Sequence, residues 1–168
     1  MNPAALAFPP TQLGRALLIL LATLAILATV WILQGVGYAP CELCLTERYA
    51  FYAGAPLAAL TAWLASRSQS ALARAGFALL ALLFAANVAL AGYHFGVEQG
   101  WWQGPTACTG ALSGPVDVND LAKAINAAPI INCGDVRLRI LGMSLAGWDT
   151  IVSAAIAVYA ALAARLAR

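Results

Sequence analysis

Four long apolar segments dominate the pattern of hydrophobic and polar positions along the chain. A helix that crosses a bilayer needs about 20 predominantly apolar residues, and each segment is long enough. Together they predict an all-α membrane protein, a four-transmembrane-helix bundle forming one domain over residues 1–168. The predicted spans cover approximately residues 16–34, 41–65, 75–95 and 145–166.

A long and more polar segment, residues 96–144, separates the third and fourth spans. Between residues 117 and 126, Val118, Leu121 and Ile125 recur at helical spacing, with charged residues at other positions. This pattern predicts a short helix lying on the membrane surface. Ser144 is expected to cap the fourth span.

The first apolar segment has a second interpretation, as a cleaved signal peptide. The apolar core of a signal peptide is roughly 7–15 residues long, and this run is longer. We therefore predict a retained first span. Cleavage near residues 35–39 is the alternative, and it would leave the first cysteine pair at a new N-terminus.

Composition agrees with lipid as the solvent for much of the surface. The chain is 62% hydrophobic and 10% charged, whereas soluble domains carry roughly 25% charged residues. The net charge of +2 is too small to indicate a nucleic-acid partner.

The positions of the charges predict the orientation. Positive charge on short loops marks the cytoplasmic side of a membrane. Both termini and the 66–74 loop are therefore predicted to be cytoplasmic, and both cysteine-bearing loops to be outside. The basic residues at the cytoplasmic ends are Arg15, Arg67, Arg74, Arg165 and Arg168.

All four cysteines thus face the compartment in which disulfides form and persist. Four cysteines allow three connectivities. Their spacing favours one short pair, Cys41–Cys44, and one pair across the long loop, Cys108–Cys133.

The Cys41-x-x-Cys44 pair at the start of the second span indicates redox chemistry. On a helix, Cys41, Cys44 and Arg48 share one face. A helix N-terminus and a nearby cation both lower a thiol pKa and favour the reactive thiolate. Arg48 can also donate to an oxygen of a bound acceptor, or simply snorkel to the interface. Glu42 works against thiolate formation.

Three other polar residues lie in the predicted helices, and each has an expected role. Asn87 is expected to join helices by hydrogen bonding. Glu47 is expected to pair with Arg48 or to face water. His94, the single histidine, is either an interfacial hydrogen-bonding residue or part of a redox acceptor site.

The sequence resembles the disulfide bond formation protein B (DsbB) family of inner-membrane oxidases. The resemblance covers nearly the whole chain and is carried by five features: Pro40-Cys41-x-x-Cys44-x-x-Glu47-Arg48, Tyr93-His94-Phe95-Gly96-Val97-Glu98, Cys108, Cys133, and Leu141-Gly142-Met143-Ser144-Leu145-Ala146-Gly147-Trp148.

The resemblance implies a thiol:quinone oxidoreductase in the bacterial inner membrane. A reduced DsbA-like thioredoxin-fold protein would attack the Cys108–Cys133 disulfide, with Cys108 forming the mixed disulfide. Electrons would pass to Cys41–Cys44, and Cys44 would hand them to ubiquinone or menaquinone. Arg48 and His94 are implied to lie at the quinone.

The chain departs from the family pattern at three positions. Glu42 stands where an apolar residue is more usual, which bears on the tuning of the thiolates. Leu138 and Ile140 stand where aromatic residues are expected before Gly142, which bears on the packing of the loop.

Two other classes of function remain alternatives. One is a non-enzymatic membrane scaffold with structural disulfides or a zinc site made from the four cysteines. The other is a quinone reductase of the vitamin K epoxide reductase type. In that family the Cys-x-x-Cys lies near the last span, whereas here it precedes the second.

Overall fold

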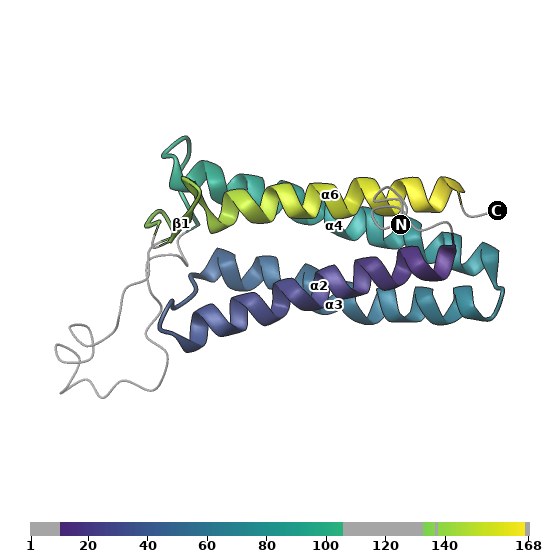
Figure 1. The fold of residues 1–168 in the computed structure, drawn as a ribbon. Helices are drawn as coiled ribbons and strands as arrows, with labels where there is room; N and C mark the ends of the chain where they lie inside the picture. The colour runs from purple at the N-terminus through teal and green to yellow at the C-terminus, as the bar shows by residue number, and fades with distance from the viewer. Residues whose placement is uncertain (1–10, 106–132, 137, 167–168) are drawn as a thin grey trace, which may run out of the picture.

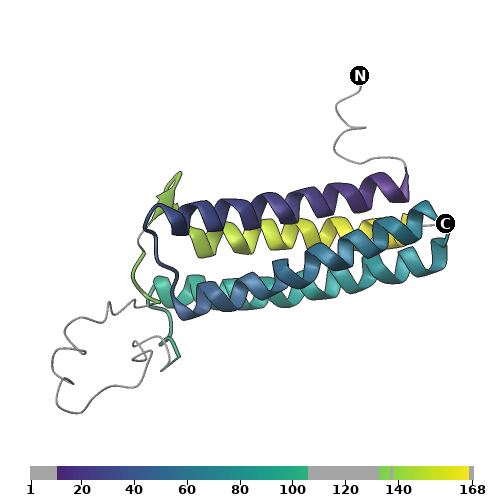
Figure 2. The same cartoon turned by 90° about the horizontal axis from the view of Figure 1, so that it is seen from below.

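The computed structural model describes residues 11–105, 133–136 and 138–166 of the 168-residue chain. The predicted surface helix at 117–126 and Cys108 lie outside these residues. Long helices run side by side and antiparallel, with a small hairpin at one end of the bundle (Figures 1 and 2). The elements are α2 (Gln12–Gly35), α3 (Glu42–Ser66), α4 (Ser70–Glu98), β1 (Arg139–Ile140), β2 (Met143–Ser144) and α6 (Leu145–Leu166).

A helix lies at the position of each predicted span, but two of the helices extend beyond the apolar stretches. α2 begins at Gln12 because the Thr11 side chain accepts a hydrogen bond from the Gly14 backbone and caps the helix. α4 begins at Ser70, so the predicted loop at 66–74 is wrong over its second half. Hydropathy marks only the apolar part of a helix, whereas these helices continue into polar residues.

Three helices, α2, α4 and α6, are long and apolar enough to cross a membrane. α3 is of similar length, with 25 residues, but Tyr49, Tyr52, Pro56 and Trp63 dilute its apolar stretch. α3 nevertheless packs along both α2 and α4.

Small residues allow α3 and α4 to approach closely. A Cβ atom built on Gly76 would lie 2.3 Å from Oγ1 of Thr61 on α3. Farther along, the rings of Phe51 and Phe84 meet edge to face, with their centroids 5.3 Å apart. Membrane helices are commonly packed through such small residues.

The helix pairs are unevenly packed around the bundle. α2 packs on α3, α3 on α4, and α4 on α6, whereas α2 and α6 have little contact with each other. The bundle is therefore loosest between its first and last helices, and the cavity described below is lined by residues of both.

The hairpin closes the same end of the bundle as the α2–α3 connection (Figure 1). Its two-residue turn places Leu141 and Gly142 at φ values of 53° and 82°, as a tight hairpin turn requires. Trp148 of α6 donates to the Ile140 carbonyl at 2.9 Å. The predicted cap is confirmed, because Ser144 Oγ accepts from the Gly147 backbone at 3.2 Å.

Candidate active site

The first turn of α3 positions the cysteine pair. Cys41 is the N-cap of the helix, and its sulfur accepts a hydrogen bond from the Cys44 backbone N–H at 3.3 Å. Serine, threonine and aspartate more commonly hold this position. A sulfur there faces the positive end of the helix dipole, which stabilises a thiolate.

Cys41 and Cys44 are both thiols in this structure. Their sulfurs lie 3.0 Å apart, at hydrogen-bond distance. The two sulfurs of the predicted pair are therefore adjacent. Cys41 is buried, while Cys44 is partly exposed.

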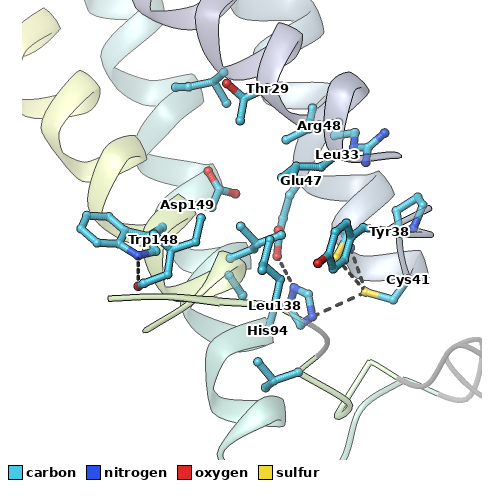
Figure 3. A pocket seen from close by; sticks show the side chains of 18 of the residues that line it. Thr29, Leu33, Tyr38, Cys41, Glu47, Arg48, His94, Leu138, Trp148 and Asp149 are labelled. Atoms are coloured by element: carbon cyan, nitrogen blue, oxygen red, sulfur yellow. Dashed lines mark hydrogen bonds and ion pairs between the residues drawn. The ribbon is translucent and has the colours of Figure 1, made fainter. Parts of the chain in front are cut away.

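His94 connects this pair to a buried carboxylate. Its Nε2 lies 3.6 Å from the Cys41 sulfur, and its Nδ1 lies 2.7 Å from Oε1 of Glu47 (Figure 3). Both predicted roles for Glu47 are wrong, because its side chain is buried and paired with His94 rather than with Arg48 or water. Residue 48 lies about 100° farther round the helix than residue 47, so the two side chains leave it in different directions.

The environment of Cys41, which precedes the first helical residue, favours its ionised form. The pKa of the Cys41 thiol is lowered, chiefly because Cys41 accepts a hydrogen bond from the Cys44 thiol; burial opposes this shift, and the contact with His94 adds to it. Glu42 is exposed to solvent, where water screens its charge. His94 and Cys44 therefore outweigh Glu42, the residue that was expected to oppose thiolate formation.

Arg48 is half-buried and is held by a residue that the sequence analysis did not single out. Its guanidinium donates to Oε1 of Gln34, near the end of α2, at 2.7 Å. This contact fixes the direction of Arg48 beside the cysteine pair. Cys41, Cys44 and Arg48 were expected to share one helix face. Cys41 precedes the helix, and all three residues line one cavity.

The cavity has a volume of about 480 Å³. Its walls come from α2, α3, α4, α6 and residues between 133 and 141, and most of the lining side chains are apolar (Figure 3). A few polar groups are placed among them, including both thiols, Arg48 and His94. A mostly apolar cavity of this size with a few polar groups is typical of a site for a small organic ligand.

A second polar cluster lies deeper in the bundle, where α4 meets α6. The amide nitrogen of Asn87 donates to Oδ2 of Asp149 at 3.2 Å and to Oγ of Ser153 at 2.9 Å. The predicted role of Asn87 in joining helices is confirmed. The sequence analysis did not single out Asp149, although it lies inside the predicted fourth span. An acid within an apolar span is itself a signal of function.

Cys133 is disulfide-bonded and lies with Cys41, Leu43 and Val97 in one buried cluster. A sulfur in a disulfide is not a thiolate ligand, so this structure does not build the alternative zinc site made from all four cysteines. Cys41, Cys44 and His94 bring three possible ligand atoms together, and no fourth histidine, cysteine or acid joins this group among the described residues.

Comparison with known proteins identifies the family of this chain. The chain matches the family described as "Disulfide bond formation protein DsbB" over residues 13–163. It is 33% identical over 162 residues to the disulfide bond formation protein B of Polaromonas naphthalenivorans (strain CJ2), covering 90% of each chain. No solved structure matches. The chain therefore belongs to the disulfide bond formation protein B (DsbB) family.

Proposed function

We propose that this chain is a membrane thiol:quinone oxidoreductase that reoxidises a DsbA-type dithiol protein. The observation that carries the proposal is the position of two adjacent thiols, Cys41 and Cys44, at the wall of a largely apolar cavity. A lipid-soluble acceptor fits such a cavity, and the redox-active sulfurs lie beside the space that it would fill.

The lining of the cavity fits a quinone. The apolar walls suit its ring and tail, the Arg48 guanidinium has N–H groups beyond the one given to Gln34 to offer a carbonyl oxygen, and His94 lines the same wall. We propose these two residues, with Cys44, as the binding residues for ubiquinone or menaquinone. A bound quinone supplies a two-electron, two-proton acceptor. Cys44 is the more exposed of the two cysteines and is therefore proposed to pass the electrons on.

The bundle also supports a route for entry from the lipid. α2 and α6 both line the cavity but have little contact with each other. A hydrophobic ligand moving in the bilayer can approach between these two helices without crossing water.

The position of the Cys133 disulfide supports electron transfer from the DsbA-type protein to the Cys41–Cys44 pair. Thiol–disulfide exchange requires a thiolate to reach a disulfide sulfur, and Cys133 lies in the same buried cluster as Cys41. We propose that Cys108, the only remaining cysteine, is the partner of Cys133 and the sulfur attacked by the DsbA-type protein. Cys41 would then exchange with Cys133.

The proposed chemistry requires one orientation. The cysteine pair lies at the start of α3, and Cys133 clusters with Cys41. The start of α3 and the hairpin lie at one end of the bundle, and the start of α2 and the end of α6 lie at the other (Figure 1). We propose four spans, including α3, in the bacterial inner membrane, with the cysteine end facing the periplasm and both termini in the cytoplasm.

A coupled assay tests this function. Purified protein in detergent is mixed with a reduced DsbA-type protein and ubiquinone, and the loss of quinone absorbance is followed. We expect turnover that needs all three components and disappears in Cys44→Ala. Quinone loss that continues unchanged in Cys44→Ala, or that never occurs, would overturn the proposal.

A further inference from the structure

We propose that Cys41, Cys44 and His94 form a three-ligand site for a zinc ion in the reduced protein, and that an ion held there blocks oxidation of the cysteine pair. The site itself stands on the geometry of these three residues, whereas its effect on turnover rests on the proposed function. It differs from the four-cysteine site considered above, because it uses neither Cys108 nor Cys133.

Three ligand atoms converge from the start of α3 and the outer part of α4. The sulfurs of Cys41 and Cys44 lie 3.0 Å apart, and Nε2 of His94 lies 3.6 Å from the Cys41 sulfur. All three atoms lie within 4.8 Å of one another. Thiolate sulfur and imidazole nitrogen are preferred donors for zinc. The reduced pair and His94 therefore present a donor set of the kind that zinc binds.

The distances need little change to hold an ion. Zinc lies about 2.3 Å from sulfur and about 2.0–2.1 Å from nitrogen, so the ligand atoms of a tetrahedral zinc lie roughly 3.5–3.8 Å apart. The separation of 3.6 Å between the Cys41 sulfur and His94 already fits. The two sulfurs would move apart by about 0.7 Å from their present 3.0 Å. Cys44 is partly exposed, which leaves room for this rotation.

Glu47 holds the imidazole as a metal-binding histidine requires. Oε1 of Glu47 lies 2.7 Å from Nδ1 of His94 (Figure 3). Metal-binding histidines almost always donate their other ring N–H to a carboxylate, a carbonyl or water, which fixes the ring and its tautomer. With Nδ1–H donated to Glu47, the lone pair of Nε2 faces the sulfurs. Both residues are buried, so this contact is shielded from competition with water.

The charges at the site favour a divalent cation. Two thiolates, one neutral imidazole and one zinc ion sum to zero, and a neutral complex avoids the cost of an unpaired charge beside apolar walls. Among the described residues that line the cavity, Arg48 is the single lysine or arginine. Its guanidinium is held by Gln34.

The fourth coordination position is left open. Among the described residues, no further histidine, cysteine or acid joins the three ligand atoms. Three protein ligands with an open position are typical of zinc sites that also bind water or another ligand, whereas structural sites are closed by four. The cavity and the partly exposed Cys44 give a hydrated ion access. We therefore expect reversible occupancy rather than a permanent structural metal.

The metal and the disulfide exclude each other. Disulfide sulfurs lie about 2.05 Å apart, and neither is then a thiolate. Zinc binding transfers no electrons, and the ion replaces two protons of the site, which pass to water. A ligand that binds only the reduced form favours that form about 100-fold when its concentration is 100 times its Kd. Bound zinc therefore protects the dithiol from oxidation until the ion leaves.

Cadmium titration tests the site, because cadmium–thiolate bonds absorb in the ultraviolet. The full-length protein is reduced, freed of reductant and kept without oxygen, in a Cys108→Ala, Cys133→Ala background. We expect one cadmium ion to bind per chain, and we expect Cys44→Ala and His94→Gln in that background each to lose tight binding. Full affinity in either variant would overturn the proposal.

Two acids of the cavity wall provide a matched comparison. Loss of a carboxylate that orients a metal-binding histidine typically lowers metal affinity about 10–100-fold, which is the loss expected for Glu47→Gln. Glu98→Gln removes another acid that lines the same cavity and should leave the affinity nearly unchanged. Equal losses in the two variants would indicate a general effect of charge and would contradict the role of Glu47.

X-ray absorption by zinc in the unmodified, reduced chain gives a test that needs no cysteine variant. With one zinc ion loaded per chain, we expect two sulfurs and one imidazole nitrogen among its neighbours. Four sulfurs would place the ion on all four cysteines and would overturn the proposal, as would a chain that retains no zinc.

Quinone reduction separates this inference from the proposed function. The reduced, metal-free protein is mixed with ubiquinone alone, with and without zinc at 100 times its Kd, where we expect reduction to slow about 100-fold and a chelator to restore it. If the metal-free protein reduces no quinone, the proposed function fails, and the cadmium titration still decides the metal site. If saturating zinc leaves quinone reduction unchanged, the metal site fails and the proposed function stands.

Discussion

Glu47 and His94, 47 positions apart in the chain, are paired in the bundle with their side-chain atoms 2.7 Å apart. This contact ties the first turns of α3 to the far end of α4. It also orients the imidazole so that its other nitrogen faces Cys41. Histidine aligned by a carboxylate and facing a thiol is an arrangement that activates a sulfur nucleophile.

An ordinary thiol has a pKa of about 8.5 and is protonated below that pH. Because the pKa of Cys41 is lowered, its thiolate should persist at a clearly lower pH. Alkylation of Cys41 should therefore stay fast as the pH falls and slow only below the lowered pKa. Because the Cys44 hydrogen bond is the largest cause and His94 a smaller one, Cys44→Ala should move this profile to higher pH by more than His94→Gln does.

The measurement is the alkylation rate of Cys41 by mass spectrometry in a Cys108→Ala, Cys133→Ala background. Glu42→Gln is the control, because Glu42 is exposed, and it should leave the profile nearly unchanged. A larger shift in Glu42→Gln than in His94→Gln would contradict this account of the thiolate.

Gln34→Leu should weaken quinone binding without touching the cysteines. Arg48 would lose the 2.7 Å contact that fixes its guanidinium and would then have to be ordered when the ligand binds. A hydrogen bond to a charged group contributes about 1.5–3 kcal/mol, so we expect the KM for quinone to rise roughly ten-fold or more, with a smaller effect on kcat. The matched control is Gln69→Leu, at an exposed position at the other end of the bundle, and an equal rise there would refute the role of Gln34.

Gly76→Ala should destabilise the bundle. The added methyl would meet the Thr61 hydroxyl at 2.3 Å, and overpacking typically costs about 1–3 kcal/mol, more than the gain of about 0.5–1 kcal/mol from replacing a helical glycine. Gly92→Ala, on the same helix, meets its nearest atom only at 4.0 Å and should be neutral or stabilising. Thermal unfolding in detergent compares the two, and a Thr61→Ala, Gly76→Ala double variant should recover much of the loss.

Ser144→Ala should loosen the hairpin end of α6. It removes the cap on the Gly147 backbone and the hydrogen-bond partner of the half-buried Glu98. Loss of a helix cap costs about 1 kcal/mol. Hydrogen exchange of the first turn of α6 should accelerate, whereas Ser70→Ala, at an exposed position, should leave that turn unaffected.

The sequence predicted the features that follow from local patterns. Apolar runs located the helices, and the Cys-x-x-Cys spacing located the cysteine pair beside Arg48. Ser144 was recognised as a cap because capping depends on neighbours in the chain. The starts of α2 and α4 were predicted too late in the chain. Polar residues, Thr11 as a cap and Ser70 as the first helical residue, begin these helices, and hydropathy does not detect them.

What sequence reasoning missed depends on contacts between distant residues. Nothing near Glu47 in the chain indicates that it faces His94, and Gln34 reaches Arg48 only because α2 packs on α3. Asp149 is different, because the sequence alone places it inside an apolar span. An acid at such a position is uncommon, so Asp149 could have been predicted as a candidate functional residue.

The most direct test of the account is a single turnover of the first cysteine pair alone. A reduced Cys108→Ala, Cys133→Ala protein, kept free of oxygen, is mixed with ubiquinone, and the thiols and quinone are counted together. The account predicts that Cys41 and Cys44 become a disulfide as an equal amount of quinone is reduced, and that Cys44→Ala in the same background shows neither change. Quinone that stays oxidised beside an intact Cys41–Cys44 dithiol would contradict it.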